Sequence, residues 1–136
     1  MQSLTVNMFR VTVVFNPMNL GNPITLLCDD ITVGASANGR QLLIPQGISV
    51  IGLYIMTLPG GSGSQALFAE TPITWLNEVS ANAFIVQSWG FGHVTIVDFN
   101  TVREATQHPF NVNVTYEGTT YAQDPTIVNE PPMPVG

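Results

Sequence analysis

Residues 110–123 read FNVNVTYEGTTYAQ, and this stretch decides the fold. Its first seven residues alternate between apolar and polar, which is the period of a β-strand with one buried face. Glu117 and Gly118 then supply a two-residue turn, after which the chain returns antiparallel. In this register Tyr121 lies opposite Val114, and an aromatic residue across from a β-branched one is a favourable pair. The stretch therefore predicts a β-hairpin.

The same period of two recurs along the chain, whereas helical periodicity does not. Short strands separated by turns are typical of an antiparallel β-sandwich or small barrel, of the immunoglobulin-like or jelly-roll type. We expect an all-β domain of about eight or nine strands over residues 1–123, followed by an extended proline-rich tail over 124–136. Beside the hairpin, strands are expected at 24–28, 30–34, 41–45, 47–58, 72–76, 83–89 and 93–99.

The charge composition is unusual, because the chain has no lysine and only three arginines among 136 residues. Lysine is the usual residue that keeps an exposed sheet edge from pairing with another molecule. A surface of Thr, Asn, Ser and Gln lacks that protection and permits self-association. The net charge of −6 argues against nucleic acid, since phosphate binding needs clustered Lys and Arg.

Hydropathy gives no sign of a membrane span, for which roughly 18 to 20 apolar residues are needed. The longest apolar run, 48–58, is interrupted by Ser49, Gly52 and Thr57. The N-terminus alternates in polarity and lacks the continuous apolar segment of a signal peptide. The expectation is a cytoplasmic protein, with export by another route or prior removal of a leader as alternatives, so the localisation stays open.

One strand is apolar on both faces. One face holds Ile48, Val50, Tyr54, Met56 and Leu58, while the opposite face holds Ile51, Leu53 and Ile55. Such a strand needs cover on both sides. It is either a central strand beneath a loop or helix, or part of a subunit interface.

The N-terminal strand changes its apolar face. Leu4, Val6 and Met8 lie on one face, but from Phe9 to Phe15 the apolar residues continue on the other. A bulge, or a strand that passes between two sheets, explains this within one molecule. Alternatively, residues 1–8 form an edge or exchanged strand that pairs with a neighbour.

No catalytic motif is present, and we expect no enzyme, metal or cofactor. The two histidines, His93 and His108, lie in expected turns and not in a nucleophile elbow or an HExxH pattern. The neighbouring Asp29 and Asp30 fit a turn better than a metal site. Cys28 is the only cysteine, so no intrachain disulfide forms, and it is either a buried structural thiol or a reactive or intersubunit thiol.

Two functions remain. The first is a structural subunit that forms homo-oligomers or filaments through sheet edges and apolar faces, with an interface at Leu4, Val6, Met8, Ile51, Leu53 and Ile55. The alternative is a small ligand-binding module, most plausibly lectin-like, because aromatic rings stack on the apolar faces of sugars. Its candidate residues are Trp75, Trp89, Phe91 and His93.

Overall fold

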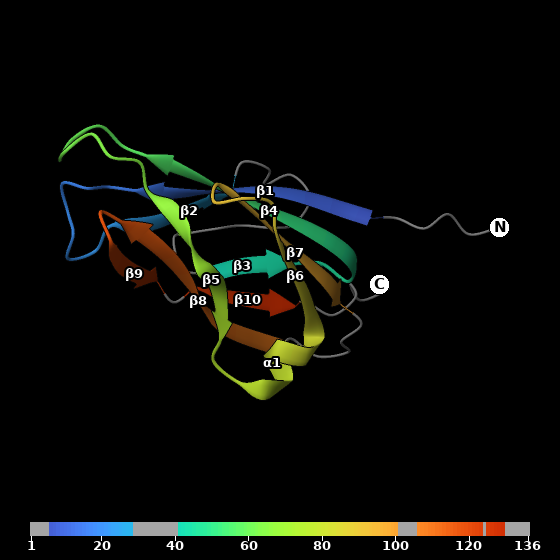
Figure 1. The fold of residues 1–136 in the computed structure, drawn as a ribbon. Helices are drawn as coiled ribbons and strands as arrows, with labels where there is room; N and C mark the ends of the chain where they lie inside the picture. The colour runs from blue at the N-terminus through green and yellow to red at the C-terminus, as the bar shows by residue number, and fades with distance from the viewer. Residues whose placement is uncertain (1–5, 29–40, 101–105, 124, 130–136) are drawn as a thin grey trace.

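The chain folds into two β-sheets packed around one core, with a short helix at one end (Figure 1). The computed structural model describes residues 6–28, 41–100, 106–123 and 125–129. Its elements are β1 (Val6–Phe15), β2 (Ile24–Cys28), β3 (Gln41–Ile44), β4 (Gly47–Thr57), β5 (Leu67–Trp75), α1 (Glu78–Ala83), β6 (Phe84–Ser88), β7 (His93–Asn100), β8 (Thr106–Tyr116), β9 (Thr119–Gln123) and β10 (Thr126–Asn129).

Sheet 1 has the strand order β2-β1-β4-β7-β6, and sheet 2 the order β3-β10-β8-β5, with β9 also paired to β8. The predicted all-β sandwich is thus confirmed. Both sheets are mixed, however, because β1 pairs with β4 and β3 pairs with β10 in parallel. An alternating pattern shows which face of a strand is buried but not the direction of its neighbour, so the sequence did not reveal these parallel pairs.

The hairpin predicted from residues 110–123 is present in the predicted register, with Val114 opposite Tyr121. Its turn residues have positive φ, 51° at Glu117 and 78° at Gly118, as a tight hairpin turn requires. The pairing then continues past β9, since the Phe110 N–H donates to the Pro125 carbonyl at 3.1 Å.

The tail prediction is wrong for the segment directly after the hairpin. Thr126–Asn129 is strand β10, which lies between β8 and β3, and its Ile127 is fully buried. The prolines suggested an extended tail, but Pro125 only removes one donor and leaves its carbonyl available for pairing. Residues 130–136 lie outside the described residues, as do the predicted strand 30–34 and the neighbouring Asp29 and Asp30.

Gly118 gives a direct test of the turn. We expect Gly118→Ala to lower the free energy of unfolding by about 1 kcal/mol, because an L-residue is strained at this φ. A Cβ at Gly118 would meet no atom within 4 Å, so the effect isolates backbone strain. Gly92→Ala is the matched control, since Gly92 is equally open and its φ is outside the strained region. Equal losses for both variants in urea denaturation would contradict the assignment.

The core lies between the two sheets. Three residues predicted for a subunit interface belong to this core. Ile51 and Leu53 are fully buried there, and Ile55 is half-buried and packs against the same cluster. The second sheet covers this face of β4, in place of the loop or helix considered from the sequence. These three side chains therefore contribute to the core and not to a surface that a neighbouring subunit contacts.

Strand β1 contains no bulge, and its apolar face changes because Val6 and Met8 lie on the outer surface, while Phe9 and the apolar residues at alternate positions after it face the core. Its register with β4 is constant from Val6 opposite Ile48 to Phe15 opposite Thr57. Phe9 faces the core, whereas the side chains of Val6 and Met8 point outward and are 42% and 70% exposed. Both readings of the switch within one molecule, a bulge and a passage between sheets, are therefore wrong for residues 6–15. Leu4 lies outside the described residues.

Helix α1 was missed by the sequence analysis, because six residues are too few to show helical periodicity. Its start has a local signal, since the Asn77 side chain accepts a hydrogen bond from the Ser80 N–H at 2.7 Å as a helix N-cap.

No helix in the described part of the chain is both long and apolar enough to cross a bilayer.

Candidate functional site

The outer face of sheet 1, which points away from sheet 2, has two rows of apolar side chains running across the strands. The strand registers place Val6, Ile48 and Phe99 in one row, and Met8, Val50, Val97 and Ile85 in the next. Met8, Ile85 and Phe99 are 70%, 55% and 47% exposed. We call this set the apolar patch: Val6, Met8, Ile48, Val50, Ile85, Val97 and Phe99.

Single exposed apolar residues are normal on a protein surface, but a contiguous group marks an interaction site. The members of the apolar patch come from four adjacent strands, β1, β4, β7 and β6, and none of them is charged. Of the predicted interface, Val6 and Met8 belong to this patch. Ile48 and Val50 were recognised as one face of the doubly apolar strand, whereas Ile85, Val97 and Phe99 were not predicted, since only the strand order brings them together.

Beside the patch, the next row of the same face runs from Arg10 through Gly52 to Thr95. A depression of about 330 Å³ lies in the sheet surface at this row, and the Tyr54 ring packs closely over Gly52. Met8 and Val50 of the apolar patch line one end of the depression, and the other end is polar. A volume of this size is in the range of small-molecule sites.

The polar end is built from stacked rings. The Arg10 guanidinium lies 4.6 Å from the centre of the Tyr54 ring, and the Tyr54 and His93 rings stack with centroids 4.2 Å apart. Trp89 stacks more loosely on His93, at 6.4 Å. The Trp89 Nε1–H also donates to the Thr95 hydroxyl at 3.0 Å, which fixes the indole beside the row of Gly52. We call Arg10, Tyr54, His93 and Trp89 the ring column.

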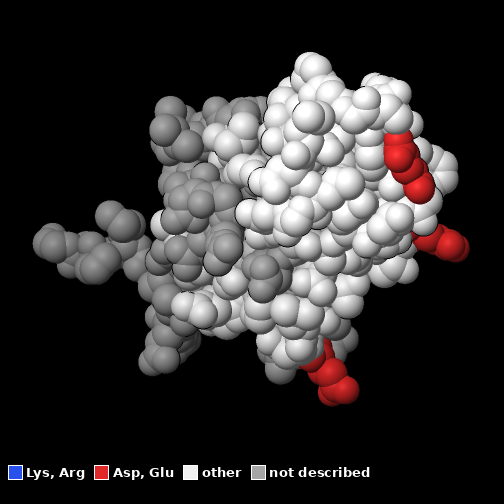
Figure 2. All heavy atoms as spheres, turned by 90° about the vertical axis from the view of Figure 1, so that its left-hand side faces the viewer, with Lys and Arg blue, Asp and Glu red and all other residues white. Residues whose placement is uncertain are grey.

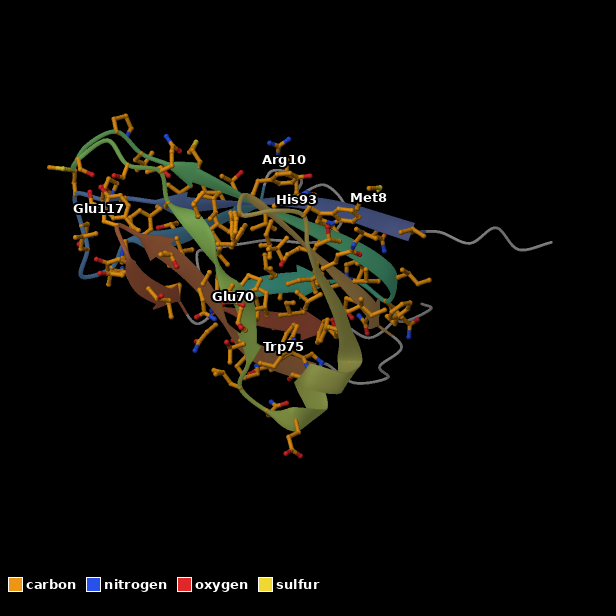
Figure 3. The ribbon with its side chains drawn as sticks, viewed as in Figure 1. Met8, Arg10, Glu70, Trp75, His93 and Glu117 are labelled. Atoms are coloured by element: carbon orange, nitrogen blue, oxygen red, sulfur yellow. The ribbon has the colours of Figure 1, made fainter. Side chains whose placement is uncertain are left out.

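The structure brings together two of the four predicted ligand-binding residues. Trp89 and His93 belong to the ring column, whereas Phe91 is 63% exposed on the intervening loop. Trp75 lies well apart from His93 (Figure 3) and stacks on Phe84, with ring centroids 4.4 Å apart, beside Phe110 at 5.2 Å. Trp75 therefore closes one end of the core.

The residue pattern did not point to Arg10, Gly52 and Tyr54 as parts of a site. Arg10 meets the other two only because β1 pairs with β4 in parallel, a contact between segments far apart in the chain. One signal was present, since a glycine inside a strand pattern often marks a close approach of a ligand or of another backbone. Gly52 is that glycine.

Ser80 and His108 form a buried pair at the other end of the molecule. The Ser80 Oγ lies 2.9 Å from His108 Nδ1, and the two residues are 0% and 4% exposed. Burial lowers the pKa of His108. A hydroxyl next to an imidazole is the arrangement of an activated nucleophile, but a buried Ser80 offers no access to a substrate. The pair is therefore structural in this conformation, and the absence of enzyme activity stays a prediction.

Asp98 lies in the core near the Gly47 end of β4. Its Oδ1 accepts a hydrogen bond from Asn129 Nδ2 at 3.0 Å, and this contact joins the two sheets. The side chain is 1% exposed, and burial raises the pKa of Asp98 from its ordinary value of 3.8 to about 6, against the smaller lowering effect of the Asn129 bond. Three buried atoms here have no hydrogen-bond partner among the described residues: Asp98 Oδ2, Asn129 Oδ1 and Ser49 Oγ.

Charge is sparse on the described surface. Arg10 is its single Lys or Arg residue, because Arg40 and Arg103 lie outside the described residues. Among the described residues on the side shown in Figure 2, the charged side chains are a few separated acidic ones near the margin. Within the described ranges, no group of three or more His, Cys, Asp or Glu residues is placed to hold a metal ion.

Cys28 is half-buried at the end of β2.

No family model matches the chain, and no curated protein matches it. Among solved structures, an inclusion body protein (PixA) from Burkholderia cenocepacia J2315 is similar in overall shape. The similarity covers 91% of this chain and 92% of that chain, at 13% sequence identity and a TM-score of 0.48.

Proposed function

We propose that the protein is a structural subunit that associates with itself through the outer face of sheet 1. The observation that supports this is the apolar patch, which is contiguous, uncharged and partly exposed on four neighbouring strands. Burial of such a surface against another apolar surface is favourable by about 25 cal/mol per Å².

The size of the face suits a weak or moderate dimer. Four strands at about 4.8 Å spacing and ten residues at about 3.3 Å rise give roughly 600 Å². Standard stable interfaces bury about 800 Å² per partner. The whole face, which includes Arg10, is therefore close to that size, while the uncharged patch alone is well below it. We expect reversible association that depends on protein concentration.

A second copy of this chain is the partner that fits the patch. When two copies meet at the apolar patch, the patch brings no charged side chain into the interface. This is favourable because a buried unpaired charge is costly. The patch presents mainly Val, Ile and Phe, the residue types with which the inner faces of the two sheets already pack. A two-fold arrangement of this contact closes a dimer. Filaments additionally need a second, head-to-tail contact, for which we propose the edge strands β6 and β3.

The test places a charge on the patch. We expect Met8→Glu and Ile85→Glu to raise the dissociation constant of the dimer at least about tenfold, because each carboxylate loses water on association. Leu67→Glu is the matched control: Leu67 is 44% exposed, but it lies on β5 of the other sheet. Sedimentation velocity over a wide concentration range measures all four proteins.

Two results would count against self-association through the patch, and a third would overturn the choice of partner. One is an unaltered protein that remains monomeric at every concentration. The other is a Leu67→Glu variant whose dissociation constant rises as much as those of Met8→Glu and Ile85→Glu. The contact would then lie elsewhere, or added negative charge at any site would weaken association. A complex with an unlike protein in place of a self-complex would also overturn the choice of partner. Carbohydrate recognition by Trp89 and Phe91 stays a prediction, for which a glycan panel with Trp89→Ala is the check.

A further inference from the structure

We infer that Asp98, Asn129 and Ser49 bind a monovalent metal cation, sodium or potassium, in the core between the two sheets. Each of these side chains has a buried oxygen atom without a partner, and one of the three oxygens belongs to a carboxylate. The site is independent of self-association, because none of the three residues belongs to the apolar patch.

The three side chains come from both sheets and meet at one place. Asp98 on β7 and Ser49 on β4 are direct partners across antiparallel strands, so their Cα atoms are about 4.5 to 5.5 Å apart. Asn129 lies on β10 of sheet 2 and reaches Asp98 through the 3.0 Å hydrogen bond from its Nδ2 to Asp98 Oδ1. Ser49, Asp98 and Asn129 are 0%, 1% and 3% exposed. An ion held by all three side chains therefore lies in the core and links three strands.

The oxygens of these side chains lack donors. Buried polar atoms are nearly always paired, so a group of unpaired ones marks the place of a bound ion or water. Asp98 Oδ2 and Asn129 Oδ1 are acceptors, and the Ser49 hydroxyl bonds to neither of them, although Ser49 lies directly opposite Asp98. The Asn100 amide on the same strand as Asp98 is already used, since its Nδ2 donates to the Ile44 and Pro45 carbonyls, at 3.0 Å each.

The charge of Asp98 favours a cation over a water molecule. Burial raises the pKa of Asp98 to about 6, so its carboxylate is largely ionised at about pH 7.5. A buried carboxylate without a positive partner is costly. A water molecule can satisfy hydrogen bonds at the site, but it leaves the negative charge in place. A cation neutralises that charge and also binds the two neutral oxygens.

The described residues offer no positive side chain for this role. Arg10 is their single Lys or Arg residue, and it lies on the outer face of sheet 1. Burial lowers the pKa of His108, so this histidine is neutral at about pH 7.5. The raised pKa of Asp98 itself has burial as its main cause, opposed by the Asn129 hydrogen bond, and no charged group of the described residues contributes to it.

One negative charge selects an ion with one positive charge. A monovalent cation and the Asp98 carboxylate together are neutral, whereas a divalent ion would leave a buried positive charge. Sodium and potassium are commonly bound by neutral carbonyl oxygens, as the Asn129 amide provides. The described ranges hold no cluster of three His, Cys, Asp or Glu residues. An alkali cation does not need such a cluster, so the two observations agree.

The first experiment is urea denaturation at about pH 7.5 in sodium chloride, potassium chloride and choline chloride at equal ionic strength. We expect sodium or potassium to raise the ratio of folded to unfolded protein, by up to about tenfold for each tenfold increase in concentration above the dissociation constant. Choline is too bulky for the core and should show only the general effect of salt. The series is repeated on Ile85→Glu, so that the result does not depend on self-association.

Two outcomes of this experiment would overturn the inference. Equal stability in all three salts would mean that no alkali cation binds and that water occupies the site. Stronger stabilisation by calcium chloride than by either alkali salt, at equal concentration, would overturn the choice of a monovalent ion. The cation and a proton compete for Asp98, so the pH dependence of stability is measured in choline chloride, where the proton has no competitor.

Variants then test the residues. Asp98→Asn keeps the shape of the side chain but removes its charge, and it should abolish the difference between the alkali salts and choline chloride. Glu70→Gln is the matched control, because it removes an exposed carboxylate on β5 and should keep that difference. Ser49→Ala removes one neutral oxygen and should weaken cation binding at least about threefold. A response to sodium or potassium that survives in Asp98→Asn would overturn the site.

Discussion

Phe15→Ala should lower the free energy of unfolding by about 3 to 5 kcal/mol, a large share of the total stability of a domain of this size. Phe15 is fully buried at the end of β1. Its ring stacks on Tyr116 at 5.0 Å and meets Tyr121 edge-on at 5.5 Å, so it joins sheet 1 to both strands of the hairpin. Alanine would leave a cavity at that junction and remove both ring contacts.

Phe91→Ala is the matched control, because it removes the same atoms from a side chain that is 63% exposed. We expect it to change stability by less than about 0.5 kcal/mol. Denaturation of both variants in guanidinium chloride gives the comparison. A small loss for Phe15→Ala would mean that the two sheets do not depend on this ring for their contact.

Asp98→Asn should stabilise the protein at neutral pH by up to about 3 kcal/mol, with little change near pH 4. The pKa of Asp98 is raised by burial to about 6, against 3.8 ordinarily, so the folded protein holds this proton more tightly than the unfolded chain. The benefit is fully present below about pH 4 and is lost as the pH rises through about 6. The asparagine side chain stays neutral throughout and does not incur that loss.

The arrangement around Asp98 favours the protonated form as well. Asp98 Oδ2 and Asn129 Oδ1 are acceptors that have no partner in the described structure, and Ser49 lies opposite Asp98 on β4. A proton on Asp98 supplies a donor to this group of oxygens. Urea denaturation of both proteins from pH 4 to pH 8 tests the idea. A stability difference that stays constant over this range would contradict a raised pKa of Asp98.

Local pattern was enough to predict the hairpin. The alternation from Phe110 to Tyr116 and the Glu117-Gly118 turn act between neighbouring residues, and the register followed from the turn length. Most strand positions were predicted for the same reason. Strand β10 was missed because its burial depends on β3 and β8, and prolines on either side dominate its local composition.

The candidate site was only partly predictable, because it depends on strand order. Trp89 and His93 were singled out as candidate ligand-binding residues, and both lie in the ring column. Arg10 and Tyr54 belong to different strands whose parallel pairing no local pattern encodes. The doubly apolar β4 was recognised, but which face points outward depends on where sheet 2 packs. The interface was therefore partly assigned to the buried face, at Ile51 and Leu53.

The order of the strands along the chain has a consequence for synthesis on the ribosome. Strands β1, β2 and β4 all belong to sheet 1 and emerge early, whereas β8, β9 and β10 of sheet 2 come from the last third of the chain. Until β8 emerges, the face of β4 with Ile51 and Leu53 lacks most of its cover. Parallel pairing between distant segments is slow, and uncovered apolar strands associate with other chains. Nascent copies of this protein are thus most vulnerable to aggregation just before their final hairpin is made.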